Sequence, residues 1–207
     1  FTIAGEGNVS VRDGDAMLIK ASGSTLETMT DEDLVRCDLD GNAFEGEEKK
    51  PSMEVSFHAW ILKSFPEINC VCHTHPTNTI KILCSGRIND FANRRLFPDQ
   101  VVRNGIKSCV VPYATPGTPL REEIKKSVEE FIGRNGYFPK LILLKNHGII
   151  TASASIQEAT VSTLMCEKSA EIFIGAKMLN IIQFLTPEEV AAVDTNPSEK
   201  YRRELYK

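Results

Sequence analysis

The sequence predicts a three-layer α/β/α fold, with a central, largely antiparallel or mixed sheet flanked by helices. Three observations support it. Predicted strands come partly as hairpins and partly separated by helices, which favours a helix-covered sheet over a regular βαβ winding. The 207 residues, 42% of them hydrophobic, can bury one substantial core. No internal repeat or low-complexity segment interrupts the chain, so residues 1–207 are expected to form one domain.

The predicted strands are short segments rich in β-branched and apolar residues, bounded by turn signals. The pair Asp13-Gly14 joins the first two into a hairpin, because an Asp-Gly pair favours a tight turn between alternating segments. In order, the predicted strands are residues 7–12, 16–20, 35–39, 68–75, 108–113, 141–144 and 149–151.

The predicted helices have apolar residues at helical spacing or begin with a capping signal. Thr186 and Glu189, for example, form a capping box at the start of the last one. The predicted helices are a short one near residues 30–33 and longer ones at 51–65, 77–84, 118–131, 156–179 and from 186 onward. Residues 87–104 are polar and irregular, and no element is predicted there.

The composition excludes two classes of partner. With a formal net charge of -4 and a pI near 5.7, the chain lacks the basic surplus of a nucleic-acid-binding protein. No run approaches the ~20 apolar residues of a membrane-spanning helix, so a soluble protein without a membrane partner is expected.

The six cysteines show no paired spacing, which is typical of free thiols in a reducing cytoplasm. Because the chain opens on Phe1 rather than methionine, its natural start is expected to be missing.

Three of the four histidines point to a metal site. His73 and His75 alternate on a predicted strand, so both rings face one side of the sheet and can converge on one ion. His147, in a tight Asn-His-Gly turn between two apolar strands, is the natural third ligand. Any one of them alone is more simply a hydrogen-bonded strand or turn residue, whereas the three together favour a metal ion. Cys70 and Cys72 lie on the opposite face of the strand, which favours core positions for both thiols.

Glu54 is a further candidate functional residue, which precedes these histidines in the sequence. It follows Pro51-Ser52 in the first turn of a predicted helix, where the helix N-terminus favours an anionic side chain. Taken alone, Glu54 is a helix-capping carboxylate. His58, one turn further along, is interpreted as a core residue or as a support for the site. The loop at residues 21–25 offers small and hydroxyl side chains to an anion, although such loops are usually plain turns.

Six short motifs are spread over nearly the whole chain. In order, they are Gly7-Asn8-Val9-Ser10, Ala21-Ser22-Gly23, Pro51-Ser52-Met53-Glu54, His73-Thr74-His75-Pro76, Pro112-Tyr113-Ala114-Thr115-Pro116-Gly117-Thr118 and Asn146-His147-Gly148. Together they resemble the class II aldolase/adducin family. The H-x-H-P and N-H-G motifs are specific, and the glycine-asparagine and serine-glycine loops add support in their company.

The resemblance implies a zinc or other divalent ion held by His73, His75 and His147. It implies that Glu54 is the catalytic acid-base residue beside this ion. Tyr113 matches a family tyrosine that reaches into the site of a neighbouring subunit and assists the leaving aldehyde. The implied activity is reversible aldol cleavage of a ketose 1-phosphate or related sugar into a dihydroxyacetone-type fragment and a short aldehyde.

The resemblance also implies how the substrate is held and how the protein assembles. The substrate phosphate is expected to lie against Asn8, Ser22, Gly23 and Ser52. Met53 stands where the sugar-phosphate aldolases have another serine, and residues 87–104 resemble an insertion. Both departures leave the sugar, and whether it is a sugar phosphate or a sugar acid, open. The family's sugar-phosphate aldolases usually form tetramers, so a homotetramer is expected.

Three alternatives remain. An epimerase, a decarboxylase or a dehydratase of the same fold would use the same metal site, although an epimerase of this family usually carries aspartate at the position of Glu54. A non-enzymatic, adducin-like interaction module would lack the full set of metal ligands. A Schiff-base aldolase would use a lysine instead of the ion, and Lys145 beside His147 is the candidate.

Overall fold

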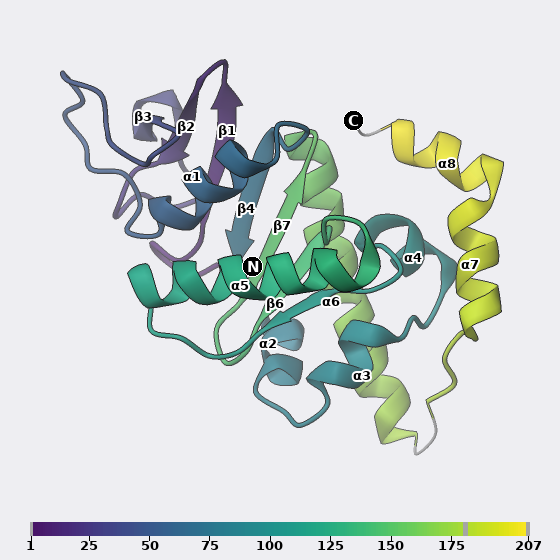
Figure 1. The fold of residues 1–207 in the computed structure, drawn as a ribbon. Coiled ribbons are helices and arrows are strands. Elements are labelled where there is room, and N and C mark those ends of the chain that lie inside the picture. Colours follow the sequence, from purple (N-terminus) through teal and green to yellow (C-terminus); the bar gives the residue numbers. More distant parts are fainter. Residues whose placement is uncertain (1, 180–181, 206–207) are drawn as a thin grey trace.

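A seven-stranded mixed sheet forms the centre of the computed structural model, which describes residues 2–179 and 182–205 (Figure 1). The strand order is β3-β2-β1-β4-β7-β6-β5. Neighbouring strands are antiparallel except β5 and β6, which are parallel. The strands are β1 (Asn8–Asp13), β2 (Ala16–Lys20), β3 (Leu34–Asp38), β4 (Cys70–Thr74), β5 (Cys109–Val111), β6 (Leu141–Leu144) and β7 (Ile149–Ser153).

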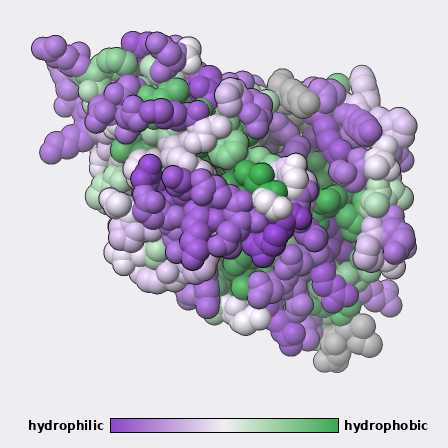
Figure 2. All heavy atoms as spheres, in the orientation of Figure 1, coloured by the Kyte–Doolittle hydropathy of each residue, from purple (hydrophilic) through white to green (hydrophobic). Residues whose placement is uncertain are grey.

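Helices cover both faces of this sheet and complete the three layers. One face packs against α1 (Val55–Ser64) and α5 (Thr118–Asn135). The other packs against α2 (Thr77–Leu83), α3 (Ile88–Asn93) and α6 (Ile156–Met178). Figure 1 shows α5 in front of the sheet and α6 behind it, and the outer surface of α5 is hydrophilic (Figure 2). The predicted α/β/α fold class is confirmed.

Alternating side chains divide the strands between two cores. In β6, Ile142 and Leu144 join the core under α1 and α5, whereas Leu141 and Leu143 join the core under α6. The whole of β6 is buried because helices cover the sheet on both sides. This explains why the strand consists entirely of apolar residues. No helix in the described part of the chain is both long and apolar enough to cross a bilayer.

Residues 87–104, where no element is predicted, form α3 and α4 (Pro98–Asn104). Their irregular pattern arises because several polar side chains in this segment are buried. Arg95 is only 1% exposed, and its guanidinium donates to the carbonyl oxygens of Phe91, Ala92 and Gly105. A buried arginine that satisfies backbone carbonyls has no apolar periodicity to reveal it.

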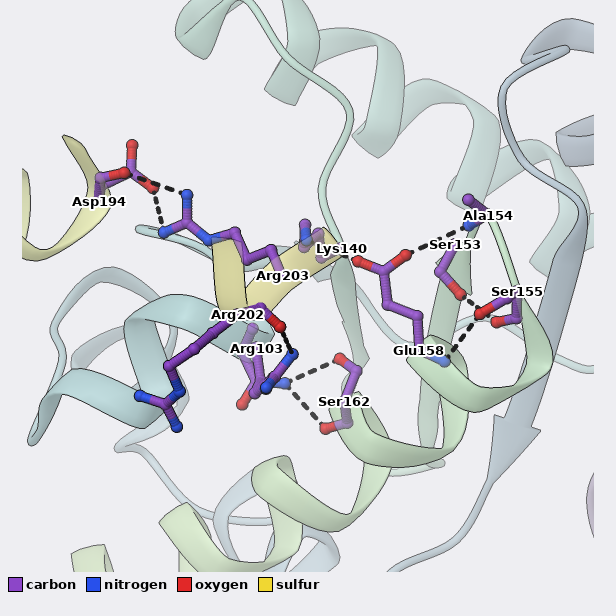
Figure 3. Close-up of polar contacts among 11 residues, drawn as sticks. Arg103, Lys140, Ser153, Ala154, Ser155, Glu158, Ser162, Asp194, Arg202 and Arg203 are labelled. Carbon is purple, nitrogen blue, oxygen red and sulfur yellow. Dashed lines mark hydrogen bonds and ion pairs between the residues drawn. The ribbon is translucent and has the colours of Figure 1, made fainter. Parts of the chain in front are cut away.

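The C-terminal part of the chain adds α7 (Pro187–Thr195) and α8 (Pro197–Glu204), which lie beside α4 (Figure 1). The capping box predicted at the start of α7 is present. We did not predict α8, whose residues are mostly charged and none of which is buried. Polar contacts hold it in place, including an ion pair of Arg203 with Asp194 at 2.8 Å (Figure 3). The short helix predicted near residues 30–33 is a 3-10 turn, Asp31–Asp33.

The turn between β6 and β7 approaches the end of β4 closely at Gly148. A β-carbon on this residue would lie 2.5 Å from Cδ2 of His75 and 2.6 Å from the carbonyl oxygen of Thr74. It would also lie 3.1 Å from Cε1 of His73. Only glycine therefore allows the turn to pack against this histidine pair.

Gly148→Ala should destabilise the protein by ~1–3 kcal/mol, as overpacking in a filled interior does, and should displace His75. Urea unfolding and the NMR signals of the histidine rings measure the two effects. Gly133→Ala is the matched control, because Gly133 lies within α5 and faces open space. That change should stabilise by roughly 0.4–1 kcal/mol. Unchanged stability and ring signals in Gly148→Ala would contradict the close approach.

Candidate active site

The sheet brings the predicted site segments to one of its ends. Strands β4 and β6 finish there and β1 and β7 begin there, because each neighbouring pair among them is antiparallel. The register places Asn8 opposite His73, and His73 opposite Ile150. The bridge between Ala21 and Pro51 brings the loop after β2 and the start of α1 to the same end.

His73, His75 and His147 form one cluster. One ring nitrogen from each lies within 4.8 Å of those of the other two. His73 is fully buried, and His75 and His147 are partly buried. The observed strand is shorter than the predicted one: β4 ends at Thr74, and His75 is the first residue beyond it. The two rings nevertheless converge, with 4.8 Å between their centroids.

The hydrogen-bond partner of the His73 ring leaves a nitrogen lone pair directed into the cluster. Nδ1 of His73 lies 2.8 Å from the carbonyl oxygen of Ile149, which only accepts, so Nδ1 carries the hydrogen. Nδ1 of His75 faces the Glu6 carboxylate at 3.6 Å, and its Nε2 lies 3.0 Å from Nε2 of His73. Nε2 of His73 therefore presents a lone pair to the cluster, where it can accept a hydrogen from Nε2 of His75 or bind a cation. Tetrahedral zinc places its ligand nitrogens roughly 3.3 Å apart, so the arrangement fits such an ion.

Burial favours the neutral, metal-binding form of two of these imidazoles, those of His73 and His147. It lowers the pKa of His73 well below the usual value, and positive charge on His147 or His75 would lower it further. Burial also lowers the pKa of His147, although the nearby Glu54 carboxylate opposes the shift. Neutral imidazole is the ligand form of histidine.

The Glu54 carboxylate faces this cluster rather than capping its helix. Glu54 occupies the N-cap position of α1, one residue before the predicted first turn, and its side chain makes no capping hydrogen bond. Instead, Oε2 lies 3.3 Å from Nε2 of His73 and accepts a hydrogen bond of 2.9 Å from Nδ2 of Asn8. Oε1 lies 3.7 Å from Nε2 of His147. The helix-capping alternative is therefore wrong.

Two buried atoms of the site have no hydrogen-bond partner among the described residues. They are Oε1 of Glu54 and Nδ1 of His147. Leaving such atoms unsatisfied is costly, and they are usually explained by a bound ion, a water molecule or a catalytic role. Their place beside the other ligands agrees with a site for a cation and its substrate.

The expected phosphate-binding residues lie on two neighbouring segments. Ser22 and Gly23 are exposed, and Gly23 has a φ of 84° with open space above it. Ser52 is buried, and its backbone N–H donates to the carbonyl of Lys20. The hydroxyl of Ser52 accepts from the N–H of Glu54 at 3.4 Å. Ser52 thus adjoins Glu54, and Ser22 and Gly23 are exposed in the loop bridged to Pro51.

Lys20 is a buried charged residue near the site that the sequence reasoning missed. Its side chain is 1% exposed, and its ammonium donates to the carbonyls of Ser24 and Ala21 at 2.5 and 3.3 Å. It also reaches the carbonyl of Gly5 at 3.5 Å, so it links the two loops beside the histidines. Burial lowers the pKa of Lys20, while Asp33 raises it. A lysine that ends an apolar strand gives little sign in the sequence that it is buried.

Tyr113 and Lys145 lie away from the cluster within this chain. Tyr113 is 60% exposed and follows β5, an edge strand separated from β4 by β6 and β7. Lys145 is exposed in the turn before His147. Schiff-base lysines are usually desolvated in an apolar pocket, so this position does not favour the lysine alternative.

The two cysteines of β4 lie on the opposite face from His73. Cys70 is buried, and burial raises the pKa of the Cys72 thiol to about 11, although a hydrogen bond with Thr163 opposes the shift. Thr163 belongs to α6, on the other side of the sheet. The prediction that these thiols point away from the imidazoles is confirmed.

Known proteins share both the sequence pattern and the fold. The family model of the class II aldolase and adducin N-terminal domain matches residues 1–174. A 3-oxo-tetronate 4-phosphate decarboxylase of Haemophilus influenzae is 31% identical over 92% of this chain and 86% of its own length. An L-fuculose phosphate aldolase of Methanococcus maripaludis is 31% identical over 83% of this chain and 86% of its own.

The crystal structure of YgbL from Klebsiella pneumoniae, whose description leaves open aldolase, epimerase and decarboxylase activity, has the same architecture. It superposes with a TM-score of 0.79 and 27% identity, covering 93% of this chain and 88% of that one. Sequence, fold and the conjunction of histidines and glutamate at one end of the sheet agree, and the chain belongs to the class II aldolase and adducin family.

Proposed function

We propose that this protein is a metal-dependent carbon–carbon lyase that reversibly cleaves a ketose 1-phosphate or related sugar. The products are a dihydroxyacetone-type fragment and a short aldehyde. The observation that carries the proposal is the Glu54 carboxylate held against three convergent histidines. A capping or core role would leave that carboxylate facing solvent or backbone, whereas here it faces the only described histidine cluster.

His73, His75 and His147 hold the ion, zinc or another divalent metal. When bound, such an ion polarises the substrate carbonyl and offsets the negative charge that develops as the carbon–carbon bond breaks. The chain's own part is to fix the three rings. The Ile149 carbonyl holds His73, and Glu6 faces His75, so each ring presents its other nitrogen to the ion.

Glu54 moves the proton that cleavage requires. When the bond breaks, its electron pair stays on the carbon next to the carbonyl, and that carbon must gain a proton. Oε2 is engaged with Asn8, whereas Oε1 has no hydrogen-bond partner among the described residues and is free to carry this proton. The alcohol that becomes the aldehyde loses a proton at the same time, and Tyr113 from a neighbouring subunit assists that fragment. Its 60% exposure leaves it available for such a role.

Ser22, Gly23, Ser52 and Asn8 bind the phosphate end of the substrate. The Nδ2 of Asn8 carries two hydrogens, so one can reach the substrate while the other serves Glu54. Lys20 supports an anion at this place, because its ammonium is buried directly beneath the loop of Ser22 and Gly23. The protein acts as a cytoplasmic homotetramer in this proposal.

Decarboxylation of a phosphorylated keto sugar acid is the second candidate. The relative from Haemophilus influenzae carries that activity in its name and spans 92% of this chain. The chemistry differs at the leaving fragment, because carbon dioxide departs from a carboxylate and no hydroxyl proton has to be removed. The same kind of carbanion takes up the proton. Met53 is 84% exposed beside Glu54 and stands where the sugar-phosphate aldolases have a serine. The loss of that hydroxyl supports a different substrate for this site.

A substrate panel decides between these reactions. The zinc-loaded protein is incubated with ketose 1-phosphates and with 3-oxo sugar-acid 4-phosphates, and aldehyde and carbon dioxide are measured separately. Aldehyde from a ketose 1-phosphate is the expected result. Carbon dioxide alone would establish the decarboxylase. Release of neither product would refute a carbon–carbon lyase and favour the epimerase, dehydratase or adducin-like alternatives. Borohydride should trap no covalent adduct, and a trapped adduct on Lys145 would instead establish the Schiff-base mechanism.

His147→Ala should remove the bound ion. The unmodified protein is expected to retain about one divalent ion per chain after dialysis, and two remaining imidazoles hold an ion far more weakly than three. Mass spectrometry of the dialysed protein measures the metal content. Lys145→Ala, in the same turn but exposed, is the control that should keep the ion. Equal metal content in both variants would show that His147 is not a ligand.

Glu54→Gln should separate proton transfer from metal binding. The amide has nearly the same size and can still accept from Asn8, but it cannot take up and return a proton at neutral pH. Turnover should fall by roughly 100-fold to 10,000-fold, with melting temperature and metal content unchanged. A folded, zinc-loaded variant that turns over at the normal rate would remove Glu54 from the mechanism.

A further inference from the structure

A row of polar residues lies behind Glu54, at the interface of α1 and β1. Asn8 and Ser10 are two positions apart on β1 and therefore share a face of the sheet. Glu54 and His58 are four positions apart at the start of α1 and share a face of the helix. Two residues along a strand advance ~6.6 Å, and four residues along a helix advance ~6 Å. The spacing of the strand pair therefore matches that of the helix pair, and the two pairs lie alongside each other.

These four side chains form one hydrogen-bonded series. Ser10 Oγ lies 2.7 Å from His58 Nδ1, and His58 Nε2 contacts Asn8 Oδ1. Asn8 Nδ2 then donates to Glu54 Oε2 at 2.9 Å. His58 is fully buried, and Asn8 and Ser10 are 3% and 1% exposed. Water therefore has little access to the series.

The chemistry of each group fixes the direction of every hydrogen bond. The Glu54 carboxylate only accepts, so the Asn8 amide must present its nitrogen to Glu54 and its oxygen to His58. Nε2 of His58 must then carry the ring hydrogen. Because burial lowers the pKa of His58 to about 3, the ring is neutral and Nδ1 is bare. Nδ1 accepts the hydroxyl hydrogen of Ser10.

We propose that His58 is a positioning residue for the lyase reaction: it holds the Asn8 amide in the one orientation that donates to Glu54. Ser10 supports it by selecting the ring tautomer. In this arrangement, Oε2 of Glu54 is fixed and Oε1 is left to face the substrate. The side-chain hydrogen bonds of His58 and Ser10 are with each other and with Asn8, so both act through Asn8.

Loss of the His58 donor has a definite consequence. An Asn8 amide that is no longer held can rotate by 180°, since its oxygen and nitrogen have nearly the same shape. Its oxygen would then face the Glu54 carboxylate, and two acceptors repel each other. Glu54 would turn away from the histidines although no residue of the cluster had changed. A merely structural role for His58 predicts lower stability but an unchanged carboxylate position.

The test compares two substitutions of similar size. His58→Leu removes the donor, whereas His58→Gln restores an N–H that can reach Oδ1 of Asn8. The inference rests on the proposed function for its kinetic part. With the substrate found active in the panel, kcat of His58→Leu should fall about 10-fold to 100-fold with KM little changed, as outer supports of metal sites typically show. His58→Gln should recover most of kcat at an equal or lower melting temperature.

Two readouts need no activity and so distinguish failure of this inference from failure of the proposed function. Nitrogen NMR of the unmodified, zinc-loaded protein should show His58 with its hydrogen on Nε2, and Ser10→Ala should shift the ring toward the other tautomer. Crystal structures of the two His58 variants should show Glu54 displaced in the leucine variant and restored in the glutamine variant. A hydrogen on Nδ1 in the unmodified protein, or equal kcat in both variants, would overturn the proposal.

Discussion

Burial of a carboxylate and imidazoles at one end of the sheet is the constraint on which the site depends. Polar groups removed from water are costly unless each finds a partner, and the fold supplies one for most of them. The Ile149 carbonyl serves His73, and Asn8 serves Glu54. These partners come from strands on either side of β4, so the antiparallel neighbours of this central strand hold the chemistry in place.

Periodicity was sufficient to predict the architecture. The continuous apolar run of β6 and the helical apolar spacing of α5 predicted both elements where they are found. The two helices within residues 87–104 were not predicted, because Arg95 and its buried polar neighbours satisfy backbone groups instead of packing as an apolar stripe. The helix α8 was missed for the opposite reason, since its mostly charged surface lacks a buried face.

The residues of the candidate site were likewise only partly predictable from the sequence. Residues whose spacing on one strand or in one turn is informative, such as His73, His75 and His147, could be grouped from the sequence, and the structure brings them together. Glu54 was placed near them only by resemblance, because a helix-capping role explained the local sequence better. Lys20 was missed because its role depends on backbone carbonyls of the loop that follows it and of a second loop at Gly5. Contacts of that kind exist only after folding.

The register of β1 has a consequence for how sequence changes are tolerated. A shift of one residue in a strand exchanges its two faces, which would turn Val9 and Val11 toward α1 and remove both Asn8 and Ser10 from it. The sheet could keep its backbone hydrogen bonds and much of its apolar packing after such a shift. An insertion or deletion in this hairpin can therefore leave a folded protein with every histidine and Glu54 intact but without the support behind the carboxylate. Inactivity in such a variant would be no sign that a catalytic residue had been lost.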